Sequence, residues 1–168
     1  MKLFFTAGTQ FRFLRMDDVV RQVARCHPSW QLVYQTGPGA DISGMGEFGN
    51  LDMEALMAAE IFSSHLRQAD LVVTHAGMGN VITCLEWGKP FVMLPRQAAY
   101  GEHRNDHQVG SAEAVNRLYA VPVFREADEL TKYLCQGKFP REVDDASVQL
   151  LQQREAFGVS LQRLIDSL

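Results

Sequence analysis

A histidine and two glycines interrupt the chain where an apolar run gives way to a predicted helix. The stretch is LVVTHAGMGNVITCLEWGKP, residues 71–90, and it places His75, Gly77 and Gly79 at this corner. Glycine lets a ligand approach the backbone, and amides at a helix N-terminus carry about half a positive charge from the helix dipole. The corner therefore predicts a phosphate or pyrophosphate site. A tight turn that uses glycine only for its conformational freedom is the structural alternative.

Two further corners with unusual side chains also follow apolar runs. They are TAGTQ, residues 6–10, and PRQAAYGEHRNDHQ, residues 95–108. The second carries His103 and His107, which would lie one turn apart on a helix, as in a two-histidine metal site. The HExxH pattern is absent from the sequence and a third ligand is not evident, so we predict no metal site. A metal hydrolase that uses both histidines stays open as an alternative.

Apolar runs of strand length alternate with amphipathic segments of helix length along the chain. Strands are predicted over 2–8, 30–37, 70–76, 90–95 and 119–124, and helices over 16–26, 52–68, 80–88, 103–118 and 126–136. The glycine-rich residues 37–50 predict an irregular connection with one short strand near 46–48. This alternation is typical of a doubly wound, Rossmann-like α/β domain with a parallel sheet. In such a sheet ligands bind at the carboxyl ends of the strands, where all three corners lie.

Composition narrows the class of protein. The 168 residues fit one domain, and we predict a single domain over 1–168 in which 140–168 form a C-terminal helical extension. The net charge of −4 and the absence of Lys/Arg runs argue against nucleic-acid binding. Cys26, Cys84 and Cys135 are odd in number and far apart, which predicts free thiols in a reducing cytoplasm. The N-terminal apolar run is too short for a signal peptide or a membrane span.

The corner motifs also resemble a known family. The HAG corner followed by GKP, an apolar strand, a proline and a downstream HQ is similar to the C-terminal, donor-binding half of GT-B glycosyltransferases of family 28. FFTAGTQF resembles the opening glycine loop of that half, and YQTG resembles its second strand. The resemblance covers roughly residues 1–135. It is closest to the small soluble subunits of bipartite transferases, which include PssE-type subunits of exopolysaccharide and capsule synthesis and the eukaryotic subunit acting on dolichol-linked GlcNAc.

The resemblance implies a role for each matching residue. It places Gly8 and Thr9 near the diphosphate, and His107 and Gln108 near the donor sugar. It assigns the phosphates and the adjoining ribose to His75, Gly77, Met78, Gly79 and Asn80. Many relatives bind the ribose through a glutamate whose position is Thr83 here, and Glu86 lies one turn later, so either residue is a candidate. Arg96, Arg104 and His75 are implied as electrostatic contributors, without a metal or a cofactor.

The implied function is that of the donor-binding subunit of a hexosyl- or hexuronosyltransferase. The UDP-sugar is the substrate, and a lipid-diphosphate-linked saccharide is the acceptor. The acceptor site and the catalytic base are expected on a membrane-associated, PssD-like partner, which would hold this cytoplasmic protein at the inner membrane. Two other hypotheses stay open. One is a stand-alone nucleotide-sugar-binding regulatory module. The other is a nicotinamide-dependent or metal-dependent enzyme, although the glycine corner that contains Gly77 and Gly79 does not have the GxGxxG spacing of a dinucleotide site.

Overall fold

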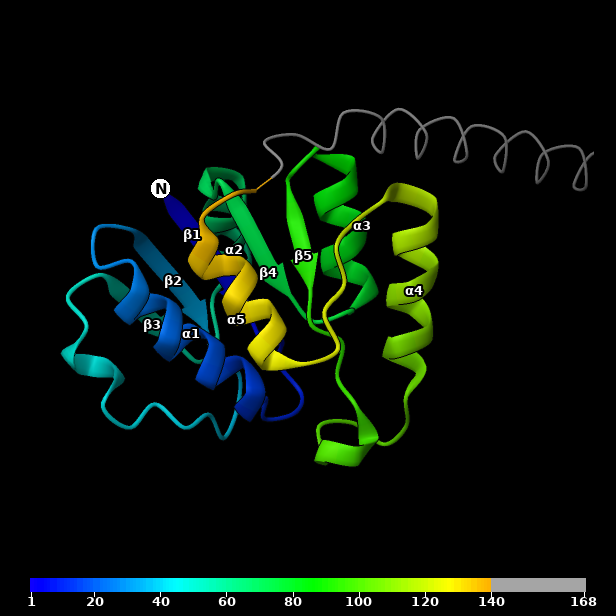
Figure 1. Cartoon of the computed structure of the whole chain (residues 1–168), viewed down its shortest axis with the longest axis horizontal. Helices are drawn as coiled ribbons and strands as arrows, with labels where there is room; N and C mark the ends of the chain where they lie inside the picture. Colours follow the sequence, from blue (N-terminus) through cyan, green and yellow to red (C-terminus); the bar gives the residue numbers. More distant parts are fainter. Residues whose placement is uncertain (140–168) are drawn as a thin grey trace, which may run out of the picture.

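A five-stranded parallel sheet forms the centre of the protein. The computed structural model describes residues 1–139, and its strands lie in the order β3-β2-β1-β4-β5 (Figure 1). Their bounds are Lys2–Thr6 (β1), Gln31–Gln35 (β2), Leu51–Glu54 (β3), Leu71–Thr74 (β4) and Phe91–Met93 (β5). Every pairing between neighbouring strands is parallel. The predicted doubly wound α/β class is therefore confirmed.

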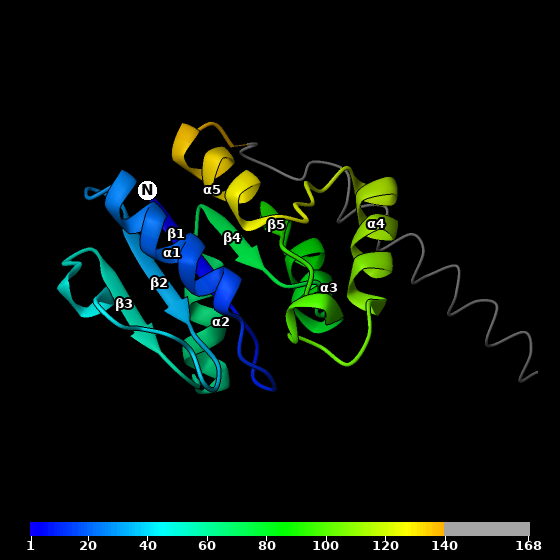
Figure 2. The ribbon, with the colours of Figure 1, turned by 60° about the horizontal axis from the view of Figure 1, so that its bottom comes forward.

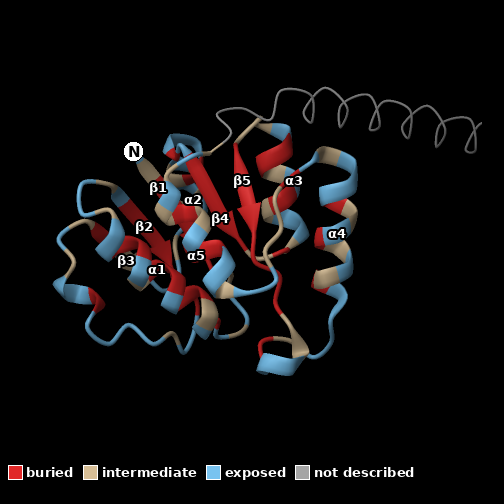
Figure 3. Cartoon of the chain, in the orientation of Figure 1, coloured by how far each residue is buried: buried red, intermediate tan, exposed pale blue. Residues whose placement is uncertain are grey.

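Helices cover both faces of this sheet. Their bounds are Leu14–Cys26 (α1), Ala59–Gln68 (α2), Met78–Glu86 (α3), His107–Tyr119 (α4) and Ala127–Gln136 (α5), with short 3₁₀ helices at Met45–Glu47 (η1) and Ala98–Tyr100 (η2). Helices α1 and α5 lie side by side on one face, and α2 and α3 cover the other (Figure 2). Side chains alternate along β1, so Leu3 and Phe5 pack in the α1/α5 core and Phe4 packs in the opposite core. Both faces of the central strands are buried (Figure 3).

The strand order reverses between β1 and β4. The chain passes from β1 outward through β2 to β3, and then returns to add β4 and β5 on the other side of β1. The loops that follow β1 and β4 consequently leave the sheet in different directions and open a crevice at the carboxyl edge. This edge carries the glycine corners.

Three predicted elements differ in the structure, in addition to the start of α4. The helix predicted over 52–68 is wrong in its first part, because residues 51–54 pair with β2 and α2 begins only at Ala59. The strand predicted near 46–48 is wrong, since η1 occupies this position. The strand predicted over 119–124 is reduced to one bridge between Met93 and Val123, next to Pro122, which has no N–H to donate to a ladder.

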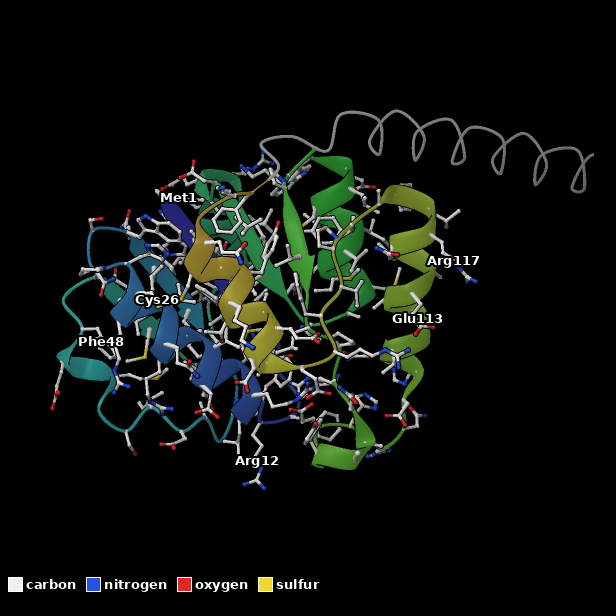
Figure 4. All side chains as sticks on the ribbon, viewed as in Figure 1. Met1, Arg12, Cys26, Phe48, Glu113 and Arg117 are labelled. Carbon is white, nitrogen blue, oxygen red and sulfur yellow. A yellow bond between two sulfur atoms is a disulfide. The ribbon has the colours of Figure 1, made fainter. Side chains whose placement is uncertain are left out.

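The prediction of three free thiols is also wrong. Cys26 and Cys135 form a disulfide that joins the C-terminal ends of α1 and α5, with their Cα atoms 6.0 Å apart (Figure 4). The two residues are 109 positions apart in the sequence, so only the packing of α1 on α5 reveals the pair. Cys84 is free and buried, and burial raises the pKa of its thiol to about 12.

Two expectations concern the ends of the chain and the membrane. Within residues 1–139, no helix combines the length and the apolar character needed to cross a bilayer. The helical extension predicted over 140–168 lies outside the described residues.

Candidate functional site

A cleft of about 730 Å³ lies at the carboxyl edge of the sheet. The loops after β1, β4 and β5 contribute to it, so the structure brings the three sequence corners together. The predicted residues that line the cleft are Gly8, Thr9, His75, Gly77, Met78, Gly79, Asn80, Arg96, His107 and Gln108. Its volume falls in the range of about 300–1,000 Å³ that is typical of small-molecule sites.

Three predicted residues do not line the cleft: Thr83, Glu86 and Arg104. The Thr83 hydroxyl donates a hydrogen bond of 2.9 Å to the Gly79 carbonyl within α3. Glu86 lies on the exposed side of the last turn of the same helix. A ribose contact from either residue stays a prediction.

The imidazole of His75 is wedged between two glycines. A Cβ atom at Gly77 would lie 2.4 Å from His75 Nε2, and a Cβ atom at Gly8 would lie 2.8 Å from His75 Cε1. Gly77 has φ −75° and ψ 119°, a conformation open to any residue. Glycine is therefore needed at 77 for the space that the ring takes, and not for its backbone freedom. At position 8 glycine is needed for both reasons, because the ring takes the space of a Cβ and the backbone has a φ of +82°.

His75 is an uncharged imidazole at neutral pH. Burial, and next the positive charge of Arg96, lower its pKa from 6.5 to about 4. Its Nδ1 atom is buried and makes no hydrogen bond. A buried polar atom without a partner is costly in a native protein and calls for an explanation such as a ligand or a water molecule. The neutral ring can contribute to binding through a hydrogen bond, and not through a net charge.

The N-terminus of α3 presents backbone amides to the cleft. Gly77 is its N-cap and offers no side chain, and Val81 is the first residue whose amide bonds back to Gly77, at 3.2 Å. The amides of Met78, Gly79 and Asn80 precede that bond and have no partner within the helix. A Cβ atom at Gly79 would meet no atom within 4 Å, so this stretch of backbone is open to a ligand.

The Asn80 side chain has a structural role. Its Nδ2 atom donates to the hydroxyl of Thr74 at 3.2 Å and to that of Thr6 at 3.5 Å. These threonines end β4 and β1, the strands on either side of the reversal point. The amide side chain thereby ties the start of α3 to both strand ends, which leaves its backbone N–H as the group available to a phosphate.

The third corner holds two histidines that approach each other without sharing a helix. α4 begins at His107 and residues 101–106 form turns, so the helix predicted from 103 is wrong there. The ring centroids of His103 and His107 are 4.4 Å apart, and His107 also contacts Asn105. Partial burial, followed by His107, Arg96 and Arg104, lowers the pKa of His103. Within residues 1–139, no three His, Cys, Asp or Glu side chains are grouped as metal ligands would be.

Electrostatically, the cleft favours an anion. The chain has a net charge of −4 and contains 20 acidic residues. Nevertheless, no aspartate or glutamate is found among the described residues that line the cleft, whereas three histidines and Arg96 are. The α3 amides and dipole add positive potential at the same place. The arrangement can hold a phosphate or diphosphate without repulsion from a neighbouring carboxylate.

Nine residues that line the cleft were not among the predicted site residues: Ala7, Gln10, Phe11, Gln35, Met57, Ala59, Phe62, Ser63 and His103. Three of them, Ala59, Phe62 and Ser63, lie in the first turns of α2 and were missed because the sequence predicts that this helix begins at residue 52. The polar and apolar alternation of LDME, residues 51–54, is the signal that could have identified β3 and moved the helix start to this edge.

Comparisons with known proteins agree with this geometry. The model of the glycosyltransferase family 28 C-terminal domain matches residues 2–142. The UDP-N-acetylglucosamine transferase subunit ALG13 of Candida albicans is 26% identical over 100 residues, which are 58% of this chain and 32% of that protein. The subunit of the same name from Mus musculus is 30% identical over 73 residues, 44% of this chain and 6% of that protein. The chain thus spans a third or less of these curated relatives.

Solved structures support the fold. A crystal structure of the glycotransferase of kitacinnamycin superposes with a TM-score of 0.58 at 25% identity, covering 87% of this chain and 34% of that one. Acinetobacter baumannii MurG gives a TM-score of 0.60 at 16% identity, covering 90% and 47%, and shows the fold alone. The predicted equivalence to one half of a GT-B glycosyltransferase is confirmed. With more than four fifths of its length matched by the family model, the chain belongs to the glycosyltransferase family 28 C-terminal domain family.

Proposed function

We propose that this protein is the donor-binding subunit of a two-chain glycosyltransferase. In this proposal it transfers a hexosyl or hexuronosyl unit from a UDP-sugar to a lipid-linked acceptor in exopolysaccharide or capsule synthesis. The observation that carries the proposal is the α3 N-terminus, whose first three amides face a cleft without a carboxylate among its described residues. The names of the two curated relatives, each a UDP-N-acetylglucosamine transferase subunit, support UDP as the nucleotide.

Each group in the cleft has a task in this function. The α3 amides stabilise the charge that develops on the departing diphosphate, as fixed donors do in other transfer reactions. The neutral ring of His75, which lines the cleft, offers one further hydrogen bond. Gln108 uses its carbonyl oxygen to accept from the Arg96 N–H at 3.1 Å, so its amide nitrogen is the end that reaches the sugar, next to His107. The UDP-sugar acts as a substrate, and we propose no metal or cofactor.

The second chain follows from what glycosyl transfer requires. An acceptor hydroxyl must be aligned with the anomeric carbon, and a base must take its proton. The described residues bring no carboxylate into the cleft, so we place the base and the acceptor site on a membrane-associated, PssD-like partner. That partner would present a lipid-diphosphate-linked saccharide and would keep this cytoplasmic protein at the inner membrane.

Calorimetry with UDP tests the proposal through two matched valine substitutions. Gly79→Val fills the open space in front of the α3 amides, and Gly110→Val makes the same change in α4, where a Cβ also meets nothing within 4 Å. We expect UDP to bind the wild type, Gly79→Val to raise the Kd by about tenfold or more, and Gly110→Val to leave it unchanged. Absence of UDP binding, even with the partner chain present, contradicts the proposal.

Transfer is tested separately from binding. The chain co-expressed with the partner should move label from a UDP-sugar onto a lipid-diphosphate acceptor. UDP binding without transfer in that preparation would instead favour a stand-alone nucleotide-sugar-binding module.

A further inference from the structure

Arg96 is the most enclosed cation near the cleft, and four of the five N–H donors of its guanidinium are already used. The residue is 2% exposed and follows β5 at the carboxyl edge of the sheet. Its two Nη atoms donate to backbone carbonyls of Ala7 (2.5 Å), Phe11 (2.6 Å), Arg12 (2.8 Å) and Glu102 (3.0 Å). Two Nη atoms carry four hydrogens, so these four bonds leave no Nη hydrogen for a phosphate.

Three of the four carbonyls belong to the loop over residues 7–12, between β1 and α1. Gly8 and Thr9 in this loop line the cleft. The guanidinium also lies 4.6 Å from the centroid of the Phe13 ring, where the loop enters α1. Arg96 therefore reaches from β5 past β4 to hold both ends of this loop, whose first residue, Ala7, also donates its backbone N–H to the Gln35 carbonyl of β2 at 2.9 Å.

Holding a carbonyl also fixes the amide of the same peptide. The described residues contain no cis peptide bond, and in a trans peptide the C=O and N–H point in opposite directions. The bond from Arg96 to the Ala7 carbonyl accordingly sets the direction of the Gly8 N–H. From the β2 side, the loop is supported by Gly37, where a Cβ would lie 2.4 Å from the Gly8 carbonyl oxygen.

The surroundings of Arg96 are built to keep it in place. The Gln108 side chain accepts from its backbone N–H, and the carboxylate of Glu102 stands nearby as a counter-charge. Glu102 is itself held by Arg15 through contacts of 2.8 Å and 2.6 Å. A side chain fixed from so many sides is positioned more rigidly than one free to follow a substrate.

We propose that Arg96 is a positioning residue, which holds the 7–12 loop in the shape that binds the donor diphosphate without touching that diphosphate itself. The inference rests on the proposed function, and it differs from the expectation that Arg96 contributes its charge directly. A guanidinium fork is essential to the first role, whereas any cation serves the second.

Arg96→Lys separates the two roles, because it keeps the charge and loses the fork. Hydrogen exchange of the full chain should show faster exchange in a peptide covering 7–13, with the β4 and α4 peptides unchanged. The Kd for UDP should rise by about 10- to 100-fold, since the loop N–H groups that bind the charged diphosphate would lose their positions. Arg117→Lys, an exposed residue of α4 (Figure 4), is the matched control and should change neither quantity.

A second pair of variants tests the loop without altering Arg96, in case Arg96→Lys does not fold. Gly37→Ala pushes on the Gly8 carbonyl, and Gly44→Ala introduces alanine at the same φ of +69° with no atom within 4 Å. We expect Gly37→Ala to loosen the 7–13 peptide and weaken UDP binding, and Gly44→Ala to do neither.

The outcomes separate this inference from the proposed function. Wild-type exchange and wild-type UDP affinity in Arg96→Lys would overturn the positioning role. If the wild type binds no UDP but Arg96→Lys still loosens the loop selectively, the proposed function fails and the positioning of the loop is supported.

Discussion

Replacing Gly77 by alanine tests the claim that the His75 ring dictates this glycine. The new Cβ would lie 2.4 Å from His75 Nε2 and 2.9 Å from Cε1, closer than such atoms pack. The backbone at Gly77, with φ −75° and ψ 119°, accepts alanine without strain. The cost is therefore steric alone, and overpacking of this kind destabilises a protein by about 1–3 kcal/mol.

A double-mutant cycle with His75→Ala isolates this contact. In the His75 background Gly77→Ala should lower the free energy of unfolding by about 1–3 kcal/mol. In the His75→Ala background the obstacle is gone, and the loss of glycine entropy from the unfolded chain should make the same change neutral or stabilising by about 0.4–1 kcal/mol. Urea unfolding with an unchanged m-value measures all four proteins, and the coupling energy is the difference between the two effects.

Gly79→Ala is the control for helix formation at the same corner. Its Cβ would meet nothing within 4 Å, and alanine is favoured over glycine in a helix by about 1 kcal/mol. We expect stability to be unchanged or raised. An equal cost of Gly77→Ala in both His75 backgrounds, or a cost of Gly79→Ala as large as that of Gly77→Ala, would refute the reasoning.

Three further predictions concern stability. The pKa of His75 is about 4 in the folded protein and 6.5 ordinarily, so protonation of this residue opposes folding. Its contribution of about 3 kcal/mol to the free energy of unfolding is present above pH 6.5 and is lost as the pH falls toward 4. Urea unfolding at several pH values should show this loss in the wild type and not in His75→Gln. Reduction of the disulfide between Cys26 and Cys135, which closes a loop of 109 residues, should lower the free energy of unfolding by up to about 4–5 kcal/mol on the chain-entropy model. If the stability of a Cys26→Ser/Cys135→Ser protein still fell on addition of reductant, the disulfide assignment would be contradicted. Tyr34→Phe removes the 2.5 Å hydrogen bond to buried Asp17 and should cost about 1–3 kcal/mol in thermal or urea unfolding; a neutral result would show that the pair adds nothing.

Central strands were predictable because both of their faces are buried. β1, β2 and β4 are nearly continuous apolar runs, which a parallel sheet covered on two sides requires. β3 is an edge strand with the burial pattern of a half-exposed segment, and its four residues read equally well as the first turn of a helix. Pairing with β2 decides its conformation, and an alternation over only four residues is a weak local signal of that pairing.

The location of the site was predictable for a similar reason. Three corners follow three parallel strands, and parallel strands end at one edge, so the corners had to meet. What each residue does there was less accessible. The need for Gly77 depends on a His75 ring two residues away, and the use of Arg96 depends on carbonyls more than 80 positions earlier in the chain. These contacts exist only once the fold is formed.

Amide chemical shifts on UDP titration test the central claim most directly. If the α3 N-terminus binds the diphosphate, the amide resonances of Met78, Gly79 and Asn80 should shift together with that of Gly8, and the shifts should follow one saturating curve. Residues of the α1/α5 face should not respond. Saturable UDP binding that shifts amides elsewhere and leaves those of α3 unmoved would contradict the account.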